Sequence, residues 1–353
     1  MVEKNKVEEQ HLSILQKRWL KFKTLKRGYY ALVIITTLYG ISFLLPILIN
    51  NRALIVSYEN ELYFPIIKGY VSGQTFGQDV PGEAKYRELR KSFKEDNTGN
   101  WVLMPPYPYS PFEDITIDGN KMYESPSGKH WLGKDNTGRD VFARLCYAFN
   151  ISISFALILT IINYFLGIFI GGSMGYFGGK FDLFFQRLIE IWASLPMLFV
   201  IIIISSIVKP SFFLLIGIYT LVNWIGMTYL IRAEFYREKA KDYVAAALSM
   251  GQSDVKVMFK HILPNSLVPI ITYFPFSVVA GISALVGLDY LGFGLAPPTP
   301  SWGQMLDVGL QNVSKWWMVF SPVAAQFLTL LSIVFIGEGV REAFDPKVYS
   351  RLR

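Results

Sequence analysis

Six long stretches of the sequence carry no charged side chain, and they restrict the chain to a membrane fold. They cover residues 29–49, 151–177, 191–208, 211–231, 262–288 and 316–337. At about 1.5 Å per helical residue, roughly 20 apolar residues cross the hydrocarbon core of a bilayer. Composition agrees, because 52% of the residues are hydrophobic and only 17% are charged. We therefore expect an all-α membrane protein with six transmembrane helices.

The third stretch is the shortest of the six. We expect its helix to begin nearer Leu183, which brings Arg187 and Glu190 to the membrane boundary, where they can form an i, i+3 pair or extend their charged ends to the interface. Kinks are expected at the prolines inside the spans, which are Pro196, Pro269 and Pro275.

The basic residues between the spans predict the orientation of the chain. With the N-terminus inside, the cytoplasmic pieces hold 20 Lys and Arg, whereas the short outer loops hold only Lys209 and Lys315. The positive-inside rule then places both termini in the cytoplasm of a multi-pass protein of the cell (inner) membrane. The apolar run after the basic N-terminal segment is too long for a signal peptide, so we expect it to remain as an anchor.

The same pattern predicts the division of the chain. The expected parts are a basic cytoplasmic segment (1–28), a first transmembrane helix (29–49), an irregular extracytoplasmic insertion with an amphipathic lead-in (50–150), a core of five helices with a cytoplasmic loop at 232–264 (151–338), and a cytoplasmic tail (339–353).

The polar stretch Asp242–Pro264 lies between two apolar runs and has the pattern helix, turn, helix. Asp242 is a plausible N-cap, and Gly251 can end the first helix in a left-handed turn. The second helix can begin near Ser253, and Pro264 is expected to stop it. Its expected apolar face consists of Val255, Met258, Phe259 and Ile262. An ordinary amphipathic surface helix would have the same pattern, so the pattern alone does not establish a docking site.

This stretch resembles the cytoplasmic loop of ABC importer permeases. Small residues at 245–247, Gly251 and Leu263-Pro264 match the loop motif, and the flanking residues resemble the oligopeptide and dipeptide (OppC/DppC) subfamily, with YejE-type peptide permeases most similar. Ala245 stands where the family motif has glutamate. The resemblance implies a coupling helix that docks on a separate ATPase and involves Asp242, Tyr243, Ala245, Ala246, Ala247, Met250, Gly251, Ser253, His261, Leu263 and Pro264.

The resemblance also implies a type I ABC importer permease fold and a set of partners. These are a second homologous permease in a heterodimer, two ATP-binding subunits, an extracytoplasmic peptide-binding protein and membrane lipid. The chain itself would hold no cofactor, because ATP and Mg²⁺ belong to the ATPase subunits. The implied function is peptide import without an ATPase site in this chain.

The segment 50–150 is the unusual part of the sequence. Apolar triplets at 54–56, 62–64 and 115–117 suggest short strands, and the proline-rich run 104–111 suggests an irregular loop. The Yej-type resemblance, carried by Leu62-Tyr-Phe-Pro65 and Gln74-Thr-Phe-Gly77, implies a role in receiving the loaded binding protein. The alternative is an insertion that only packs on the spans.

Two further strings resemble the outer-surface segments of peptide permeases. His130–Asp140 matches the string before the second span, which gives Arg139, Asp140 and Arg144 as candidate contacts to the binding protein. Leu291–Gly294 and Ser301–Leu306 match the outer loop after the fifth span, which adds Trp302 as a candidate. The alternative is that these residues only anchor the chain at the membrane surface. Residues 128–135 imitate a phosphate loop but lack its hydroxyl residue and the preceding strand.

Uncharged polar residues inside the spans are the candidates for lining a pore. They are Asn163 and Asn223, although hydrogen bonds between helices are an alternative role. The glycines at 167, 171 and 175 have the spacing of four that lets helices approach closely, and helix packing is the favoured interpretation. No motif for catalysis, metal binding or nucleic-acid binding is present.

Three alternatives remain at this stage. An autonomous carrier or channel is disfavoured, because no ionisable residue lies in the middle of a span. A receptor or enzyme that works through residues 50–150 would need a recognisable site there. An ABC permease for a solute other than a peptide is open, because the binding protein normally selects the substrate.

Overall fold

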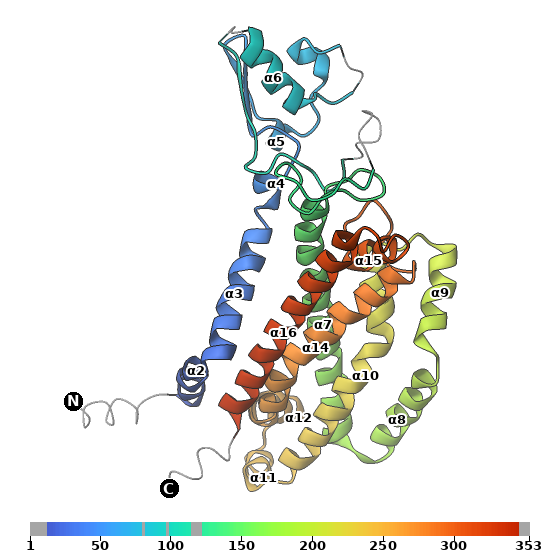
Figure 1. Ribbon diagram of the computed structural model, residues 1–353. Helices are drawn as coiled ribbons and strands as arrows, with labels where there is room; N and C mark the ends of the chain where they lie inside the picture. The colour runs from blue at the N-terminus through green and yellow to red at the C-terminus, as the bar shows by residue number, and fades with distance from the viewer. Residues whose placement is uncertain (1–12, 80–81, 97–98, 114–121, 346–353) are drawn as a thin grey trace, which may run out of the picture. The chain divides into compact units, whose positions relative to one another are not determined.

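The computed structural model describes residues 13–79, 82–96, 99–113 and 122–345, and the chain is predominantly helical (Figure 1). It divides into two compact units. The first unit contains residues 1–36, 152–296 and 327–353, and the second contains residues 37–151 and 297–326. The strand expected at 115–117 lies outside the described residues.

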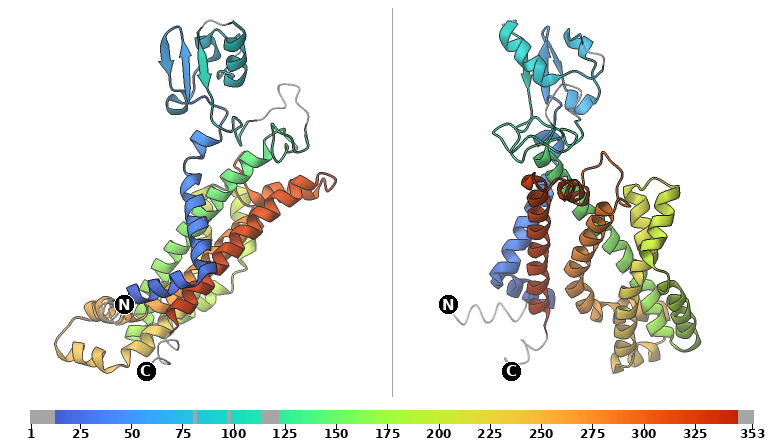
Figure 2. Two further views of the ribbon diagram at one scale, coloured as in Figure 1. Left: turned by 60° about the vertical axis from the view of Figure 1, so that its left-hand side comes forward. Right: turned by 45° about the vertical axis from the view of Figure 1, so that its right-hand side comes forward.

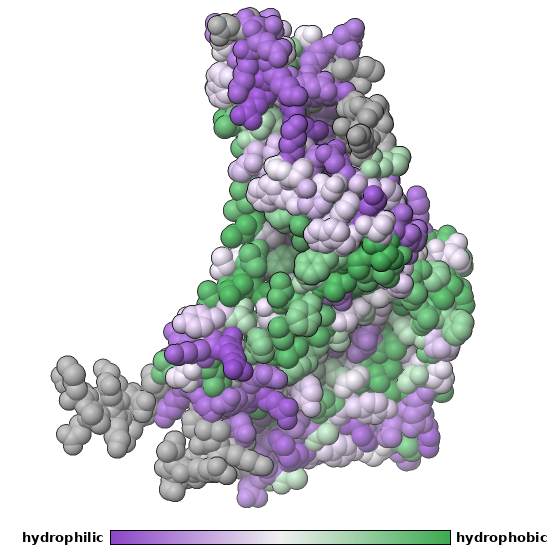
Figure 3. Space-filling model, in the orientation of Figure 1, coloured by the Kyte–Doolittle hydropathy of each residue, from purple (hydrophilic) through white to green (hydrophobic). Residues whose placement is uncertain are grey.

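Four helices are long and apolar enough to cross a membrane. They are α7 (Val141–Phe177), α10 (Phe212–Lys239), α14 (Leu267–Tyr290) and α16 (Trp316–Phe344). Each coincides with an uncharged run of the sequence. Figure 3 shows largely hydrophobic side chains on the surface over the long helices, as lipid-facing helices require.

The expected third span is a bent pair of helices. Helices α8 (Gly179–Ala193) and α9 (Met197–Ile207) meet at an angle of 66°, so they count as a fifth span only if taken together. Pro196 lies at the break, where it has no N–H to donate and disfavours a helical residue before it. The kink at Pro196 is confirmed. The pair between Arg187 and Glu190 is also confirmed, with Nη1 and Oε2 2.7 Å apart.

The first expected span, 29–49, is divided between α3 (Lys26–Ser42) and α4 (Leu45–Leu48), and a further helix, α2 (Ile14–Thr24), precedes it. Ser13 and Gln16 form a capping box at the start of α2. Phe22 of α2 is buried against Ile336 and Ala343 of α16. With 17 residues, α3 is shorter than the other candidate spans, so the count of six spans is not established by helix length.

Two proline expectations have different outcomes. Pro275 lies inside α14, as expected for a proline within a span. Pro269 was wrongly expected to kink a span, because α14 begins at Leu267 and Pro269 falls in its first turn. A proline there removes no intrahelical hydrogen bond, since the first N–H groups of a helix have no partner.

The glycine stripe of α7 packs against α10. A Cβ at Gly167 would lie 2.6 Å from Met227 Cγ, and one at Gly171 would lie 2.3 Å from the Thr228 carbonyl oxygen. A Cβ at Gly175 would come equally close to the backbone of α10. The helix-packing interpretation of the stripe is therefore confirmed.

The insertion contains a small folded subdomain rather than only irregular loops. Strands β1 (Ile55–Tyr58), β2 (Glu61–Tyr63) and β3 (Trp101–Leu103) form an antiparallel sheet in the order β2-β1-β3 (Figure 2). Two residues with positive φ, Glu59 and Asn60, join β1 to β2 in the twist that suits a hairpin. The strands expected at 54–56 and 62–64 exist with shifted ends, whereas β3 was missed.

Helix α6 (Tyr86–Asp96) completes this subdomain. It buries Leu89 and Phe93 against Val56 and Val102 of the sheet. Two short helices, α5 (Pro65–Lys68) and η1 (Gly73–Phe76), lie between β2 and α6 in the sequence. The surface of this part is strongly hydrophilic, as expected for a segment in water (Figure 3).

The subdomain leaves and rejoins the rest of its unit at adjacent points. The Asn50 amide donates to the Tyr107 carbonyl at 3.2 Å, and the Tyr107 amide donates to the Leu48 carbonyl at 3.0 Å. Residues 51–105 therefore form an excursion whose two ends are held together by backbone hydrogen bonds.

Candidate functional site

The polar stretch between α10 and α14 folds as a compact helical element, which we call the 242–264 element. Helix α11 (Asp242–Ser249) begins after Lys241, so Asp242 is its first residue and not its N-cap. A carboxylate in the first turn still favours the helix through the helix dipole. Glu238 at the end of α10 accepts hydrogen bonds from Lys241 Nζ at 2.7 Å and Tyr243 Oη at 3.0 Å. These bonds fix the start of α11 to α10, and burial together with the Glu238 bond raises the pKa of Tyr243.

The turn after α11 is built as expected around Gly251. This residue has φ +75°, in the left-handed region, and an added Cβ would meet nothing within 4 Å. The Gly251 and Gln252 amides donate to the carbonyls of Leu248 and Ala247 at 2.9 and 3.2 Å, which satisfies the end of α11. Across the turn, His261 Nε2 and Gln252 Oε1 lie 2.7 Å apart.

The second half of the element differs from the expected amphipathic α-helix. Helix α12 (Asp254–Lys256) begins after Ser253, as expected, but continues as the π-helix η3 (Val257–Ile262). The hydrogen bonds of a π-helix join residues five apart, and Val257 and Ile262, which have this spacing, are both buried, whereas Val255 in α12 is exposed. The apolar face expected from α-helical spacing was therefore wrong at Val255.

Pro264 does not end the helical path, which corrects another expectation. It is the second residue of α13 (Leu263–Asn265), which leads through Ser266 into α14. A proline at this position of a new helix costs no hydrogen bond. The 242–264 element is thus continuous with the membrane helix that follows it.

The buried face of the element packs on the long helices. Val244, Ala247, Val257, Met258 and Ile262 join a cluster with residues of α7 and α10, namely Tyr164, Tyr176, Met227, Ile231 and Phe235. Tyr176 Oη donates to Asp254 Oδ1 at 2.6 Å, and Lys239 Nζ donates to the Tyr176 carbonyl. The element is therefore in direct contact with α7 and α10.

Several apolar side chains of the element are exposed. Met250 is 71% exposed, Val255 63% and Leu248 41%. Ala245 and Ala246 are exposed beside them, whereas Ala247 is buried. We call these five exposed residues, 245, 246, 248, 250 and 255, the docking face. Its small side chains let another surface approach the backbone of α11 closely.

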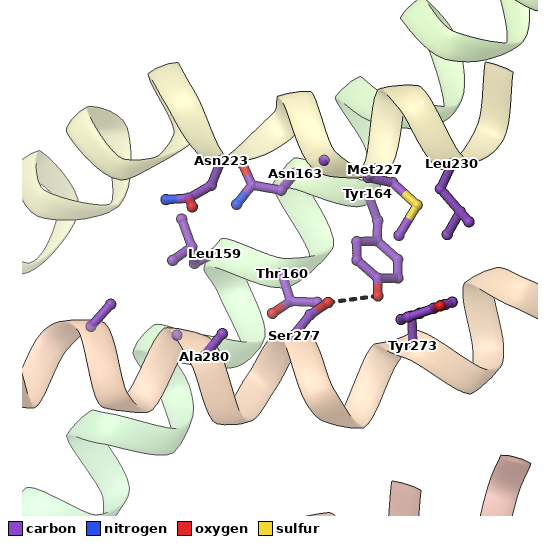
Figure 4. A pocket seen from close by; sticks show the side chains of 13 residues that line it. Leu159, Thr160, Asn163, Tyr164, Asn223, Met227, Leu230, Tyr273, Ser277 and Ala280 are labelled. Carbon is purple, nitrogen blue, oxygen red and sulfur yellow. Dashed lines mark hydrogen bonds between the residues drawn. The ribbon is translucent and has the colours of Figure 1, made fainter. Parts of the chain in front are cut away.

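A cavity lies between α7, α10 and α14, and both expected pore residues line it (Figure 4). Its volume is about 410 Å³. Asn163 and Tyr164 come from α7, Asn223 from α10, and Tyr273 and Ser277 from α14. Tyr164 and Ser277 were not singled out from the sequence. The available signal was polar residues near the middle of spans at helical spacing, as in Thr160, Asn163 and Tyr164.

The segment before α7 holds its charged residues inside the protein. Asp140 accepts from Tyr107 Oη at 2.7 Å and from the Ala143 amide at 2.8 Å, and it lies 2.8 Å from His130 Nδ1. It therefore caps the N-terminus of α7. Burial, followed by the charge of Asp140, raises the pKa of the Tyr107 hydroxyl above its ordinary value.

Three of the four side chains named as candidate contacts to a binding protein are buried. Asp140, Arg144 and Trp302 are at most 2% exposed. Arg139 Nε is engaged by Asp135 Oδ2 at 3.0 Å, and Trp302 Nε1 donates to the Leu145 carbonyl at 3.2 Å. Asp140, Arg144 and Trp302 are therefore held inside the protein, whereas Arg139 is partly exposed.

No group of three or more His, Cys, Asp or Glu side chains is placed to hold a metal ion within the described parts of the chain. His130 and His261 lie in different units and have separate hydrogen-bond partners.

Comparison with known proteins shows extensive similarity. Residues 163–350 match the family described as binding-protein-dependent transport system inner membrane component. The chain is 39% identical to the inner membrane ABC transporter permease protein YejE of Escherichia coli, over 94% of this chain and 96% of the relative. It is 35% identical to the peptidoglycan transport system permease protein YejE of Agrobacterium fabrum, over 94% and 93%. It is 34% identical to the dipeptide transport system permease protein DppC of Bacillus subtilis, over 63% and 70%.

These matches confirm the family resemblance drawn from the loop motif. The matched region contains the 242–264 element and every residue named around the cavity except Leu159 and Thr160. Proteins of this kind work with ATPase subunits and a substrate-binding protein, and they are membrane components with several spans. The chain belongs to the binding-protein-dependent transport system inner membrane component family, the permease subunits of ABC importers.

Proposed function

We propose that this permease imports peptides. The observation that carries the proposal is the 39% identity to a YejE permease over 94% of the chain, together with similarity to a dipeptide permease. The uncharged lining of the cavity supports it, because amide and hydroxyl groups suit a peptide backbone. The alternative substrate is the one named by the Agrobacterium relative, peptidoglycan.

The proposed assembly contains this chain, a second homologous permease, two ATPase subunits and an extracytoplasmic binding protein. ATP and Mg²⁺ would be held by the ATPase subunits alone. The chain would cross the cell membrane six times, with α3 as the first span and the bent pair α8 and α9 as the third. Both termini, residues 1–28 and 339–353, and the loop 232–264 would then lie in the cytoplasm.

The 242–264 element is the proposed connection to an ATPase subunit. Support comes from its two faces, since one packs on α7 and α10 while the docking face is apolar and exposed. Exposed apolar groups gain free energy when a partner covers them, by roughly 25 cal/mol per Å². Ala245 departs from the family motif, because it presents a methyl group where the motif has a carboxylate, so any contact that this carboxylate makes in the family is absent here.

A substitution at Gly251 tests the coupling role. Gly251→Val places a β-branched residue at φ +75°, which disfavours the turn although no neighbour is within 4 Å. We expect the reconstituted transporter to lose stimulation of ATP hydrolysis by the loaded binding protein. Gly179→Val is the matched control, because Gly179 also has a positive φ, +55°, and open space but lies at the start of α8. Normal transport by the Gly251 variant would contradict the coupling role.

Peptide import itself is tested with proteoliposomes that contain the complete transporter. We expect ATP-dependent accumulation of labelled tri-alanine or tetra-alanine when the binding protein is present. Accumulation by this chain alone would instead support an autonomous carrier. Uptake of muropeptides with no uptake of these peptides would favour the peptidoglycan alternative.

A further inference from the structure

The cavity between α7, α10 and α14 is polar at a depth where polar groups are costly. Asn163, Asn223 and Ser277 lie near the middle of the uncharged runs 151–177, 211–231 and 262–288. An amide that faces hydrocarbon without a hydrogen bond loses several kcal/mol. The groups around the cavity therefore face water, another protein group or the transported molecule.

Asn163 is the clearest sign that a partner is missing. Its side chain is only 7% exposed, and its Oδ1 has no hydrogen-bond partner among the described residues. The residue lines the cavity, and Figure 4 shows its side chain between α7 and α10. Oδ1 is an acceptor, so the partner that completes it is an N–H or O–H donor.

Further hydrogen-bonding groups surround the same space. Asn223 Nδ2 donates to the Tyr219 carbonyl at 3.0 Å, which leaves the carbonyl oxygen of Asn223 as an acceptor. The hydroxyls of Tyr164 and Ser277 lie 2.8 Å apart and connect α7 with α14 (Figure 4). Thr160 adds a third hydroxyl on α7. The cavity thus presents both donors and acceptors, as the backbone of a peptide does.

None of the residues that line the cavity is charged. Apolar walls complete it, formed by Leu159, Met227, Leu230 and the exposed ring of Tyr273. With no counter-ion available, the site suits an uncharged stretch of a ligand and disfavours a charged terminus. Its volume of about 410 Å³ falls within the roughly 300–1,000 Å³ of ligand pockets.

We propose that this cavity is a transient binding site for the backbone of the transported peptide. Asn163, Asn223 and the Tyr164–Ser277 pair form hydrogen bonds with its N–H and C=O groups. The inference rests on the proposed function of peptide import. It adds that this chain binds the backbone amide groups of the peptide, which all peptides have in common. Selection among peptide side chains would then depend on other subunits.

The test uses the complete transporter in proteoliposomes with saturating loaded binding protein and labelled tetra-alanine. Asn163→Leu keeps the approximate size of the side chain and removes its amide. We expect the maximal import rate to fall about ten-fold, which corresponds to about 1.4 kcal/mol. The KM for the loaded binding protein should not change, because the cavity is not its docking surface.

Thr220→Val is the matched control for Asn163→Leu. Thr220 lies on α10, and its hydroxyl is also buried without a hydrogen-bond partner among the described residues. Unlike Asn163, it does not line the cavity. We expect the import rate of this variant to equal that of the unmodified chain.

A crosslinking measurement keeps the proposal testable if the Asn163 variant fails to assemble. Tyr273 is 54% exposed and lines the cavity, so a benzoylphenylalanine there resembles the native side chain. During ATP turnover we expect photocrosslinks to the labelled peptide. Crosslinks only to lipid or to the second permease would overturn the proposed peptide-binding site. An unchanged import rate in Asn163→Leu would overturn it as well. If the unmodified transporter does not import tetra-alanine, it is the proposed function that fails.

Discussion

Gly171 determines how closely α7 and α10 approach each other. A Cβ at this position would lie 2.3 Å from the Thr228 carbonyl oxygen, and that atom belongs to the backbone of α10 and cannot rotate away. Close approach of this kind replaces the hydrophobic effect as the main attraction between helices in lipid. The same two helices carry Asn163 and Asn223, so the glycine contact also positions the cavity.

Gly171→Val should destabilise the assembled permease. The larger side chain forces α7 away from α10, and overpacking of this kind costs typically about 1–3 kcal/mol. We expect a lower melting temperature for the purified transporter in detergent. Gly217→Val on α10 is the control, because a Cβ at Gly217 would meet nothing within 4 Å. Equal melting temperatures of the two variants would show that the stripe does not set the helix contact.

Some residue-level features were visible in the sequence and others were not. The glycine stripe and the left-handed turn at Gly251 follow from residue type and spacing alone. The burial of Val257 in place of Val255 does not, because it depends on a π-helix that shifts the helical phase. The internal role of Arg144 was also hidden, because a charge near a membrane surface is usually exposed.

At the scale of secondary-structure elements, prolines predicted the positions of helix ends and kinks only in part. Pro264 was expected to end a helix, yet a new helix starts there and leads into α14. At Pro196, where a kink was expected, α9 follows α8 at an angle of 66°. Proline restricts only its own neighbourhood, and whether the chain then resumes a helix is decided by tertiary packing.

The folded part of the insertion can be removed with a short linker, because its two ends lie next to each other. The Leu54 amide donates to the Leu103 carbonyl at 2.8 Å, so the two chain segments are adjacent at the base of the sheet. A deletion of residues 55–102 with a short glycine linker should therefore leave the Leu45, Tyr107 and Ala143 cluster in place. We expect the shortened chain to assemble with its partners in size-exclusion chromatography.

The same deletion distinguishes the two roles considered for the insertion. If it receives the loaded binding protein, the shortened transporter should lose binding-protein stimulation of ATP hydrolysis while its basal rate remains. Insertion of the same linker between Glu59 and Asn60 controls for the altered sequence. Full stimulation after the deletion would mean that the subdomain only packs on its own unit.

For the whole molecule, hydropathy correctly located the four long spans. It did not predict that the helices of the other two expected spans are interrupted. Uncharged runs coincide with α7, α10, α14 and α16, since about 20 apolar residues in a row have few alternatives to a membrane helix. The run at 29–49 is divided between α3 and α4, and the third run is broken at Pro196. Helix length therefore leaves the number of crossings to be measured.

Cysteine labelling measures the crossings directly. In a Cys146→Ser background, each of two substitutions adds one exposed thiol. Lys209→Cys lies just after the end of α9, and Lys256→Cys is the last residue of α12. With six crossings and both termini in the cytoplasm, an impermeant maleimide should label position 209 from outside and position 256 only after the membrane is permeabilised. If the α8 and α9 pair is a re-entrant loop that does not cross, position 209 lies on the cytoplasmic side and α10 carries position 256 to the outside. Labelling of position 256 from outside would place the docking face away from the ATPase subunits, and the coupling role could not hold.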